Sequence, residues 1–221
     1  MEYKLIAIDM DGTLLNSKNE ISNRTKETLL KAIDEGKYVV LSTGRILRSA
    51  LFFGQAIELN NPIIACNGAL ISSGDEKDII YEKPMNLSIA KKVVKSAQEY
   101  DIYYHFYDIN TFYSREAIIN GLEYYESYGE NLKEQQINVE LFKNPMEVLE
   151  EKKPVIYKFV FIENDIDILL EFRKKLSQIE GINISSSWDN NIEVMNEGVS
   201  KGQGLKYLIE KLNIDKSEVV A

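Results

Sequence analysis

The N-terminal third of the chain alternates apolar runs with amphipathic stretches, and this order constrains the fold more than any other feature. Three short apolar runs, typical of buried strands, occupy residues 3–8, 38–43 and 62–66. Helical patterns occupy residues 22–36 and 45–57. Ser22 is suited to cap the first helix and Gly36 to end it. Strands and helices in alternation predict an α/β fold, a three-layer arrangement around a Rossmann-like parallel sheet with right-handed crossovers.

The middle of the chain has a different pattern. Helices are expected at residues 87–100, 116–128 and 165–179, and strands, several of them aromatic, at 102–107, 111–113, 155–162 and 182–186. Asn144 followed by Pro145 is typical of a helix start. We therefore expect an α+β cap domain at residues 83–188, inserted into a core formed by residues 1–82 and 189–221. A helix at 201–212 and a strand that begins at 218–221 belong to that core.

Charge and cysteine content exclude several classes of partner. The chain has 221 residues, with 35 acidic and 26 basic side chains and a net charge of −9, which disfavours nucleic-acid binding. The single cysteine, Cys66, has no internal disulfide partner, so a reducing compartment is expected. No run approaches 18 apolar residues, and the short N-terminal run does not resemble a signal peptide. We expect a cytoplasmic protein without a membrane partner; the sequence carries no signal for its oligomeric state.

Several catalytic chemistries are disfavoured by single residues. With His105 as the one histidine, a zinc site of several imidazoles is excluded, and a Ser-His-Asp triad would depend on that residue alone. No arginine closely follows Cys66, as a cysteine-based phosphatase requires. A calcium loop starting at Asp9 fails because Leu14 stands where glycine is needed and a strand precedes it. A capped turn with two solvated acids remains an alternative for this segment.

Polar residues follow three neighbouring predicted strands. They are Asp9, Asp11 and Gly12 after the first strand, Thr43, Gly44 and Arg45 after the second, and Asn67 and Gly68 after the third. In an open parallel sheet, ligands bind outside the carboxyl ends of the strands, so these groups are expected to converge. Paired carboxylates favour a hard divalent cation such as Mg²⁺, which shares oxygen ligands with phosphate.

The same residues carry a resemblance to a known family. Residues 9–15, DMDGTLL, resemble the first motif of the haloacid dehalogenase superfamily of phosphohydrolases. Residues 42–45, STGR, resemble its second motif, and residues 198–202, GVSKG, its third, in which Lys201 is the essential residue. The insertion between the second and third motifs, preceded by NGA at 67–69, is similar to the Cof-type branch, subfamily IIB, with a C2B cap.

The resemblance implies roles for individual residues. Asp9 would be the nucleophile that forms an aspartyl-phosphate, and Asp11 the general acid and base. Mg²⁺ would be held by the Asp9 carboxylate and the Asp11 carbonyl. The phosphoryl oxygens would be bound by Thr43 and Lys201 and by backbone groups of Met10, Gly12 and Gly44. Arg45, Asn67 and Gly68 either contact substrate or serve the structure. We expect His105 to be a cap residue and the aromatic runs around it to be mainly sheet core.

The implied function is that of a Mg²⁺-dependent phosphomonoester hydrolase acting on small phosphorylated metabolites, sugar or cofactor phosphates. A phosphosugar mutase of related fold and a phospholigand-binding protein without turnover are the alternatives. Members of this branch carry a fourth, acidic motif after the strand that follows the lysine helix, and here the sequence stops at Ala221. We expect a truncated form of a longer protein, in which one carboxylate ligand of the metal is missing.

Overall fold

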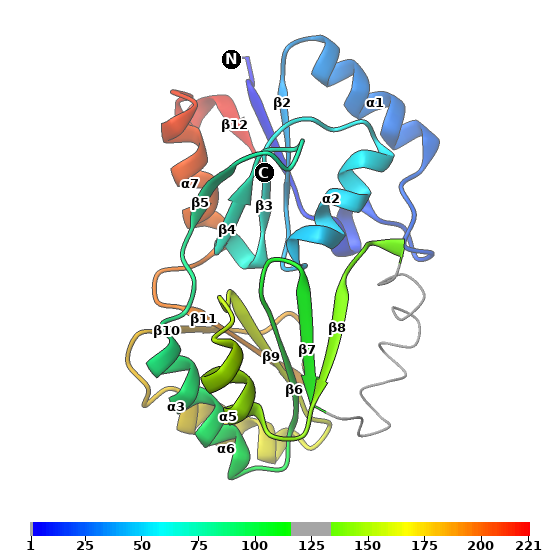
Figure 1. The fold of residues 1–221 in the computed structure, drawn as a ribbon. Helices are drawn as coiled ribbons and strands as arrows, with labels where there is room; N and C mark the ends of the chain where they lie inside the picture. Colours follow the sequence, from blue (N-terminus) through cyan, green and yellow to red (C-terminus); the bar gives the residue numbers. More distant parts are fainter. Residues whose placement is uncertain (1, 116–133) are drawn as a thin grey trace. The chain divides into compact units, whose positions relative to one another are not determined.

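The computed structural model describes residues 2–115 and 134–221, and the chain divides into two compact units (Figure 1). The core unit consists of Met1–Glu82 and Val199–Ala221. The inserted unit consists of Lys83–Gly198. The helix predicted at residues 116–128 lies outside the described residues.

The sheet of the core unit has the strand order β12-β1-β2-β3-β4-β5. The strands are β1 (Leu5–Ile8), β2 (Tyr38–Ser42), β3 (Ile63–Ala65), β4 (Leu70–Ser72), β5 (Ile79–Glu82) and β12 (Val219–Val220). β12, β1, β2 and β3 are mutually parallel, which confirms the predicted α/β fold. β4 and β5 pair in antiparallel fashion and were not predicted. The sheet is therefore mixed, because the chain reverses after β3 instead of crossing over through a helix.

Three helices cover the two faces of this sheet: α1 (Asn23–Asp34), α2 (Leu47–Ala56) and α7 (Lys201–Lys211). Figure 1 shows α1 and α2 on one face and α7 on the other. Alternate strand residues point to the two faces of the sheet. Val40 and Ile64 share an apolar cluster with Leu208 of α7. Leu41 and Ile63 point the other way and lie beside Gly54 of α2. The expected ends of α1 are confirmed, since the Ser22 hydroxyl accepts a hydrogen bond from Thr25 N and Gly36 has a φ of +79°.

The sheet of the inserted unit has the order β10-β11-β9-β6-β7-β8. The strands are β6 (Tyr103–Tyr107), β7 (Thr111–Arg115), β8 (Asn138–Phe142), β9 (Lys158–Ile162), β10 (Ile182–Ser185) and β11 (Asn191–Asn196). All neighbours are antiparallel except β7 and β8. The helices among its described residues are α3 (Leu87–Gln98), α5 (Pro145–Glu147) and α6 (Ile166–Leu176). The Asn144 side chain caps α5, as its Asn-Pro signal predicted.

The apolar core of the inserted unit lies between one face of its sheet and its helices. Tyr104 and Phe106 of β6 pack with Phe159 and Phe161 of β9, and Phe161 contacts Phe172 of α6 at 4.8 Å between ring centroids. Burial raises the pKa of the Tyr104 hydroxyl above its ordinary range. Alternate members of the aromatic runs are thus sheet core, as the sequence indicated.

The predicted end of the insertion at residue 188 is corrected by β11. This strand pairs with both β9 and β10, so it belongs to the inserted sheet, and the chain returns to the core unit only after Gly198. At the base of the unit the Asn196 side chain donates a hydrogen bond to Pro84 O at 2.8 Å. The two ends of the insertion are therefore held together directly.

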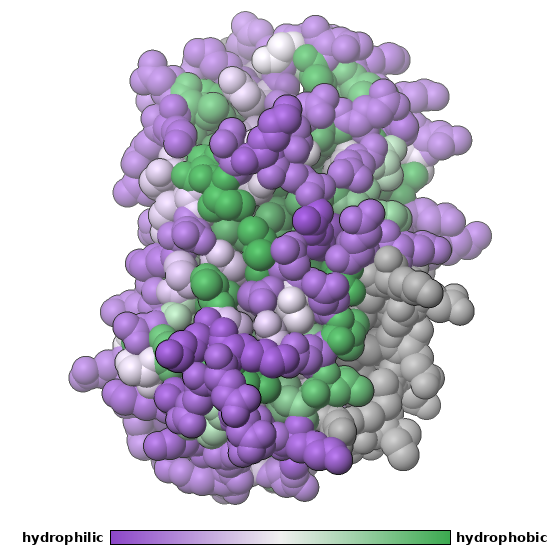
Figure 2. All heavy atoms as spheres, in the orientation of Figure 1, coloured by the Kyte–Doolittle hydropathy of each residue, from purple (hydrophilic) through white to green (hydrophobic). Residues whose placement is uncertain are grey.

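Figure 2 shows the hydropathy of the residues on one face of the molecule. On the face drawn in Figure 2, hydrophilic residues cover most of the outer parts of both units, and apolar residues form small groups. Within residues 2–115 and 134–221, no helix combines the length and apolar character that a membrane span requires.

Candidate active site

The loop after β1 carries the two predicted carboxylates. Asp9 Oδ1 accepts a hydrogen bond from Met10 N at 2.8 Å, and Leu14 N donates to Asp9 O at 3.1 Å, which closes the loop tightly. Gly12 has a φ of +73°, a conformation that side-chain-bearing residues rarely adopt. The space around Gly12 is open, so its backbone conformation is what calls for glycine. The loop leaves both Asp9 and Asp11 accessible to solvent.

Lys201 reaches Asp9 from the first residue of α7. Its Nζ lies 2.8 Å from Asp9 Oδ1, with 38% and 43% of the two side chains exposed. Ser200 is the N-cap of α7 and accepts a hydrogen bond from Gln203 N, which fixes where the helix begins. A lysine in the first turn opposes the helix dipole, so this position does not stabilise α7 by itself. The pairing instead places a cation beside the predicted nucleophile.

The ends of β2 and β3 are joined by backbone hydrogen bonds. Thr43 N donates to Ile64 O at 2.9 Å, and Asn67 N donates to Thr43 O at 3.0 Å. Thr43 is fully buried, and its hydroxyl accepts a hydrogen bond from Arg45 N at 3.2 Å. Asn67 is buried with a φ of +57°, a conformation that asparagine tolerates better than most residues. The backbone conformation of residue 67 is therefore a structural reason for asparagine at this position.

Gly68 lets the turn after β3 approach the start of α7. Its φ is +92°, and a Cβ at this position would lie only 2.2 Å from Ser200 O. Gly204, one turn into α7, also lies against Gly68. Side chains are excluded at residue 68, so this glycine serves the packing that positions Lys201.

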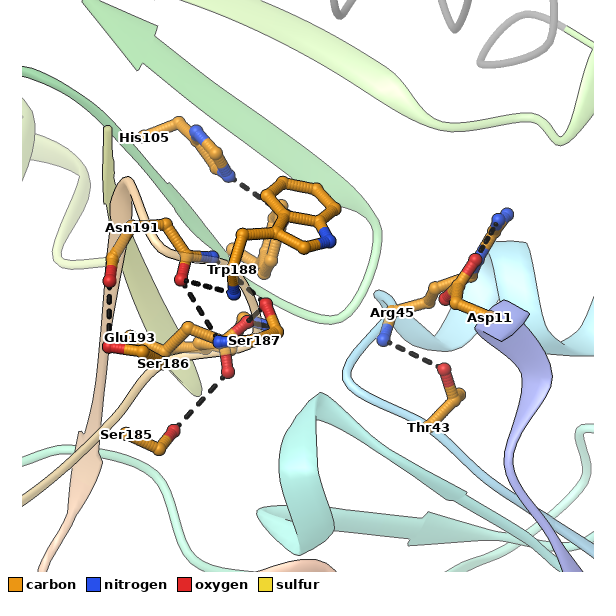
Figure 3. Close-up of polar contacts among 12 residues, drawn as sticks. Asp11, Thr43, Arg45, His105, Ser185, Ser186, Ser187, Trp188, Asn191 and Glu193 are labelled. Atoms are coloured by element: carbon orange, nitrogen blue, oxygen red, sulfur yellow. Dashed lines mark hydrogen bonds and ion pairs between the residues drawn. The ribbon is translucent and has the colours of Figure 1, made fainter. Parts of the chain in front are cut away.

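Arg45, whose role the sequence left open, pairs with Asp11. Arg45 Nε lies 3.0 Å from Asp11 Oδ2, and Arg45 Nη2 lies 2.6 Å from Asp11 Oδ1. The guanidinium also donates to the Ser49 hydroxyl at 3.3 Å and lies 5.0 Å from the ring centroid of Phe53. Figure 3 shows the side chain of Arg45 directed at Asp11, while its backbone nitrogen faces Thr43. Arg45 thus links the loops after β1 and β2.

Ser49 and Phe53 were missed by the sequence analysis. They follow Arg45 at intervals of four and eight residues, and α2 begins at Leu47. Residues at this spacing lie on one face of a helix. The spacing therefore is a usable signal for side chains that fix a motif arginine.

The atoms of the site that could bind a metal ion are oxygens. The described residues contain no group of three or more histidine, cysteine, aspartate or glutamate side chains arranged to hold a metal ion. Asp9 supplies a carboxylate, and the loop that carries it also supplies the Asp11 carbonyl. Mg²⁺ is commonly bound by one or two carboxylates together with waters and substrate phosphate, so this donor set fits such an ion.

A model of the haloacid dehalogenase-like hydrolase family matches residues 6–221. The chain belongs to this family. The resemblance that residues 9–15, 42–45 and 198–202 carried is thereby confirmed, and so is the prediction of a hydrolytic enzyme.

The chain is similar to individual members of the family, among them two curated relatives and one solved structure. The chain is 27% identical to the 5-amino-6-(5-phospho-D-ribitylamino)uracil phosphatase YitU of Bacillus subtilis, covering 100% of this chain and 80% of the relative. It is 26% identical to the pyridoxal phosphate phosphatase YbhA of Escherichia coli, covering 100% and 81%. A haloacid dehalogenase-like hydrolase structure from B. subtilis matches with a TM-score of 0.86 at 25% identity, covering 98% of this chain and 81% of that one.

Proposed function

We propose that this haloacid dehalogenase-like hydrolase is a Mg²⁺-dependent phosphatase that removes the phosphoryl group from small phosphorylated metabolites. One observation carries the proposal: the Asp9 carboxylate lies at the carboxyl end of β1 with Lys201 Nζ 2.8 Å away, and Asp11 follows two residues later. A nucleophile, a second carboxylate and a cation for the phosphoryl group thereby come from two short stretches of sequence, the loop after β1 and the start of α7.

In the first step, an Asp9 carboxylate oxygen attacks phosphorus and the bond between phosphorus and the ester oxygen breaks. The electron pair of that bond leaves with the alkoxide, which takes a proton from Asp11. Lys201 exchanges its contact with Asp9 for the phosphoryl oxygens, and the Thr43 hydroxyl donates to them as negative charge shifts. The product is an aspartyl-phosphate on Asp9.

In the second step, water attacks the phosphorus of the aspartyl-phosphate. Asp11 accepts the proton from water, the bond between phosphorus and Asp9 breaks, and phosphate and the Asp9 carboxylate are released. Arg45 orients the Asp11 carboxylate through its two parallel hydrogen bonds. Fixing this carboxylate matters because it moves a proton in both steps.

The Asp9 carboxylate and the Asp11 carbonyl are the oxygens that would hold Mg²⁺. When bound, the ion neutralises charge between the anionic nucleophile and the anionic phosphoryl group. The names of the relatives support a small phosphorylated substrate, since one is named for a phosphoribityl compound and the other for pyridoxal phosphate.

The test is release of phosphate from p-nitrophenyl phosphate, with Mg²⁺ and with a chelator. We expect Mg²⁺-dependent release that falls about a thousandfold or more in Asp9→Asn, because no other group replaces the nucleophile. Asp34→Asn, an exposed aspartate at the end of α1, is the matched control and keeps full activity. Acid quenching during turnover followed by peptide mass analysis is expected to locate a phosphoryl group on Asp9.

Activity that survives in Asp9→Asn, or that is indifferent to the chelator, would contradict the proposal. A phosphosugar mutase would return the phosphoryl group to the sugar, so free phosphate separates the two activities. Ligand binding without any phosphate release would instead favour a binding protein.

A further inference from the structure

Helix α6 of the inserted unit carries exposed apolar side chains (Figure 1). One side of the helix buries Leu169, Phe172 and Leu176 in the apolar core of its own unit. On its outer surface, Ile166 is 45% exposed and Leu170 is 57% exposed. Within the described part of the chain, α1, α2 and α3 carry no exposed large apolar side chain, whereas α6 carries three. The outer surface of α6 is therefore more apolar than those of these three helices.

Two of the three exposed side chains are neighbours. Ile166 and Leu170 are four residues apart, a spacing that brings side chains on successive turns of a helix together. With 3.6 residues per turn, Leu170 lies about 130° around the helix from the centre of the buried side. Ile168, which is 40% exposed, lies on the opposite flank of that buried side. Apolar residues scattered singly on a surface are normal, so the adjacency of Ile166 and Leu170 is the informative observation.

Opposite charges accompany these two residues. Asp167 and Lys174 are both exposed, and they are seven residues apart, so they lie on the same side of the helix. The next lysine, Lys175, is turned toward α3 instead, where it pairs with Glu99 at 2.9 Å. The outer face of α6 is defined here by Ile166, Asp167, Leu170 and Lys174. It is acidic near its N-terminal end and basic near its C-terminal end, with Leu170 between the two charges.

This arrangement is complementary to a copy of itself. In a two-fold symmetric pair, the same surface of both copies forms the interface, and every contact between two different residues occurs twice. When two α6 helices lie antiparallel and cross at Leu170, this leucine meets its own counterpart. Asp167 lies three residues before Leu170 and Lys174 four residues after it, so the two charges face each other to within about 1.5 Å along the helix. A parallel pair would instead place like charges together, which is unfavourable.

We propose that the outer face of α6 binds a second copy of this chain, in a two-fold symmetric dimer of antiparallel α6 helices. The 11 residues of α6 extend over about 16 Å, so one helix pair buries less than the roughly 800 Å² per partner of a standard interface. We therefore expect a weak dimer with a Kd of about 10–100 µM. The interface lies within the inserted unit alone, and the inference does not depend on the proposed phosphatase activity.

Sedimentation velocity of the full chain tests the dimer. Protein concentrations extend from about tenfold below to about tenfold above the expected Kd, and the weight-average sedimentation coefficient is expected to rise from monomer to dimer. Leu170→Glu is expected to raise the Kd about a hundredfold, because both copies lose the buried leucine and two carboxylates meet. Val155→Glu, at a residue of the same unit that is 51% exposed, is the matched control and leaves the Kd unchanged.

A sedimentation coefficient that does not change with concentration would overturn the proposal. So would a dimer that persists unchanged in Leu170→Glu, because the contact would then lie elsewhere. Leu170 is exposed, so its replacement leaves the apolar core of the unit intact, and circular dichroism checks that each variant is folded.

A mixing experiment tests the partner and its orientation. Asp167→Lys alone places lysines opposite each other, and Lys174→Asp alone places aspartates opposite each other. Each is expected to raise the Kd about tenfold. In an equimolar mixture, lysines of one variant face aspartates of the other at both positions, so the Kd is expected to return to within about twofold of the wild-type value. A mixture that associates as weakly as the separate variants would overturn the antiparallel pairing.

Discussion

Two lysine–carboxylate pairs, one in each unit, have nearly the same length and very different exposure. Lys201 and Asp9 of the core unit lie 2.8 Å apart with 38% and 43% of their side chains exposed. Lys158 and Glu193 of the inserted unit lie 2.7 Å apart with 4% and 9% exposed. The two pairs have the same kinds of charged group and differ in how far these groups are exposed to water.

The difference in exposure to water determines what each pair can do. Water screens the Lys201–Asp9 pair, so its net contribution to stability is expected to be at most about 1 kcal/mol, and either partner exchanges contacts at little cost. A nucleophile that must attack phosphorus needs this freedom. The Lys158–Glu193 pair is withdrawn from water, where an uncompensated charge is costly, so its geometry is fixed. Such a pair holds neighbouring hydroxyls in place.

Lys201→Met gives the largest expected effect. It removes the cation beside Asp9, so kcat for p-nitrophenyl phosphate is expected to fall about a thousandfold, while the free energy of unfolding changes by no more than about 1 kcal/mol. Steady-state kinetics and urea denaturation measure the two quantities. Lys206→Met, an exposed lysine of the same helix, is the control and changes neither. A stability loss as large as the loss in transition-state stabilisation would remove the contrast between the pairs.

Lys158→Met tests the buried pair. It leaves the Glu193 carboxylate buried without its ammonium partner, so a loss of about 3–5 kcal/mol in the free energy of unfolding is expected. The double variant Lys158→Met/Glu193→Leu is expected to recover most of that loss. Lys152→Met, which breaks an exposed pair with Glu140, is the control and costs less than about 1 kcal/mol. Equal costs at Lys158 and Lys152 would show that burial does not distinguish them.

His105 adds a pH dependence to the inserted unit. Its pKa is lowered in the folded state, so the unfolded chain binds a proton below about pH 6.5 that the folded chain does not. Stability is therefore retained above that pH and lost as the pH falls, by at most about 2 kcal/mol between pH 7 and pH 5 for one such group. Urea denaturation across this range measures the slope, and His105→Phe is expected to flatten it. An unchanged slope in the variant would assign the acid sensitivity to other groups.

Arg45→Lys gives the smallest expected effect. A lysine cannot donate two parallel hydrogen bonds to Asp11, so kcat/KM for p-nitrophenyl phosphate is expected to fall about tenfold with little change in stability. Arg48→Lys is the matched control, because Arg48 pairs with Glu76 in the same unit. We expect it to keep both kcat/KM for p-nitrophenyl phosphate and the free energy of unfolding. Identical kinetics in the two variants would exclude a positioning role for Arg45.

The sequence predicted those parts of the fold whose signals are local. Ser22, Gly36 and Asn144 mark helix ends through side chains or backbone conformations that act within a few residues. β11 was not predicted, although Ile192 and Val194 alternate with Glu193 as in a half-buried strand, and the partner that makes this charge tolerable, Lys158, is 35 residues away along the chain. The alternation is a local signal for a strand, but only the pairing with β9 and β10 assigns residues 191–196 to the inserted sheet.

The contacts within the candidate site were also predictable only in part. The family motifs predicted that Asp9 and Lys201 would share a site, and the structure brings their side chains together. The pairing of Arg45 with Asp11 was not predictable, because it depends on side-chain conformations fixed by Ser49 and Phe53. The chemical roles assigned to these residues stay predictions until the variants are measured.

The hydrogen bond between Asn196 and Pro84 also bears on how the chain folds. It joins residues 112 positions apart at the base of the insertion. For the core unit, whose sequence is interrupted there, a folded insertion acts as a loop of a few residues instead of more than a hundred. The entropy of loop closure scales with the logarithm of loop length, so the shortened loop spares the core about 3 kcal/mol. An insertion that folds first thus promotes the assembly of β1, β2 and α7, and the nucleophile and its lysine come together only after that assembly.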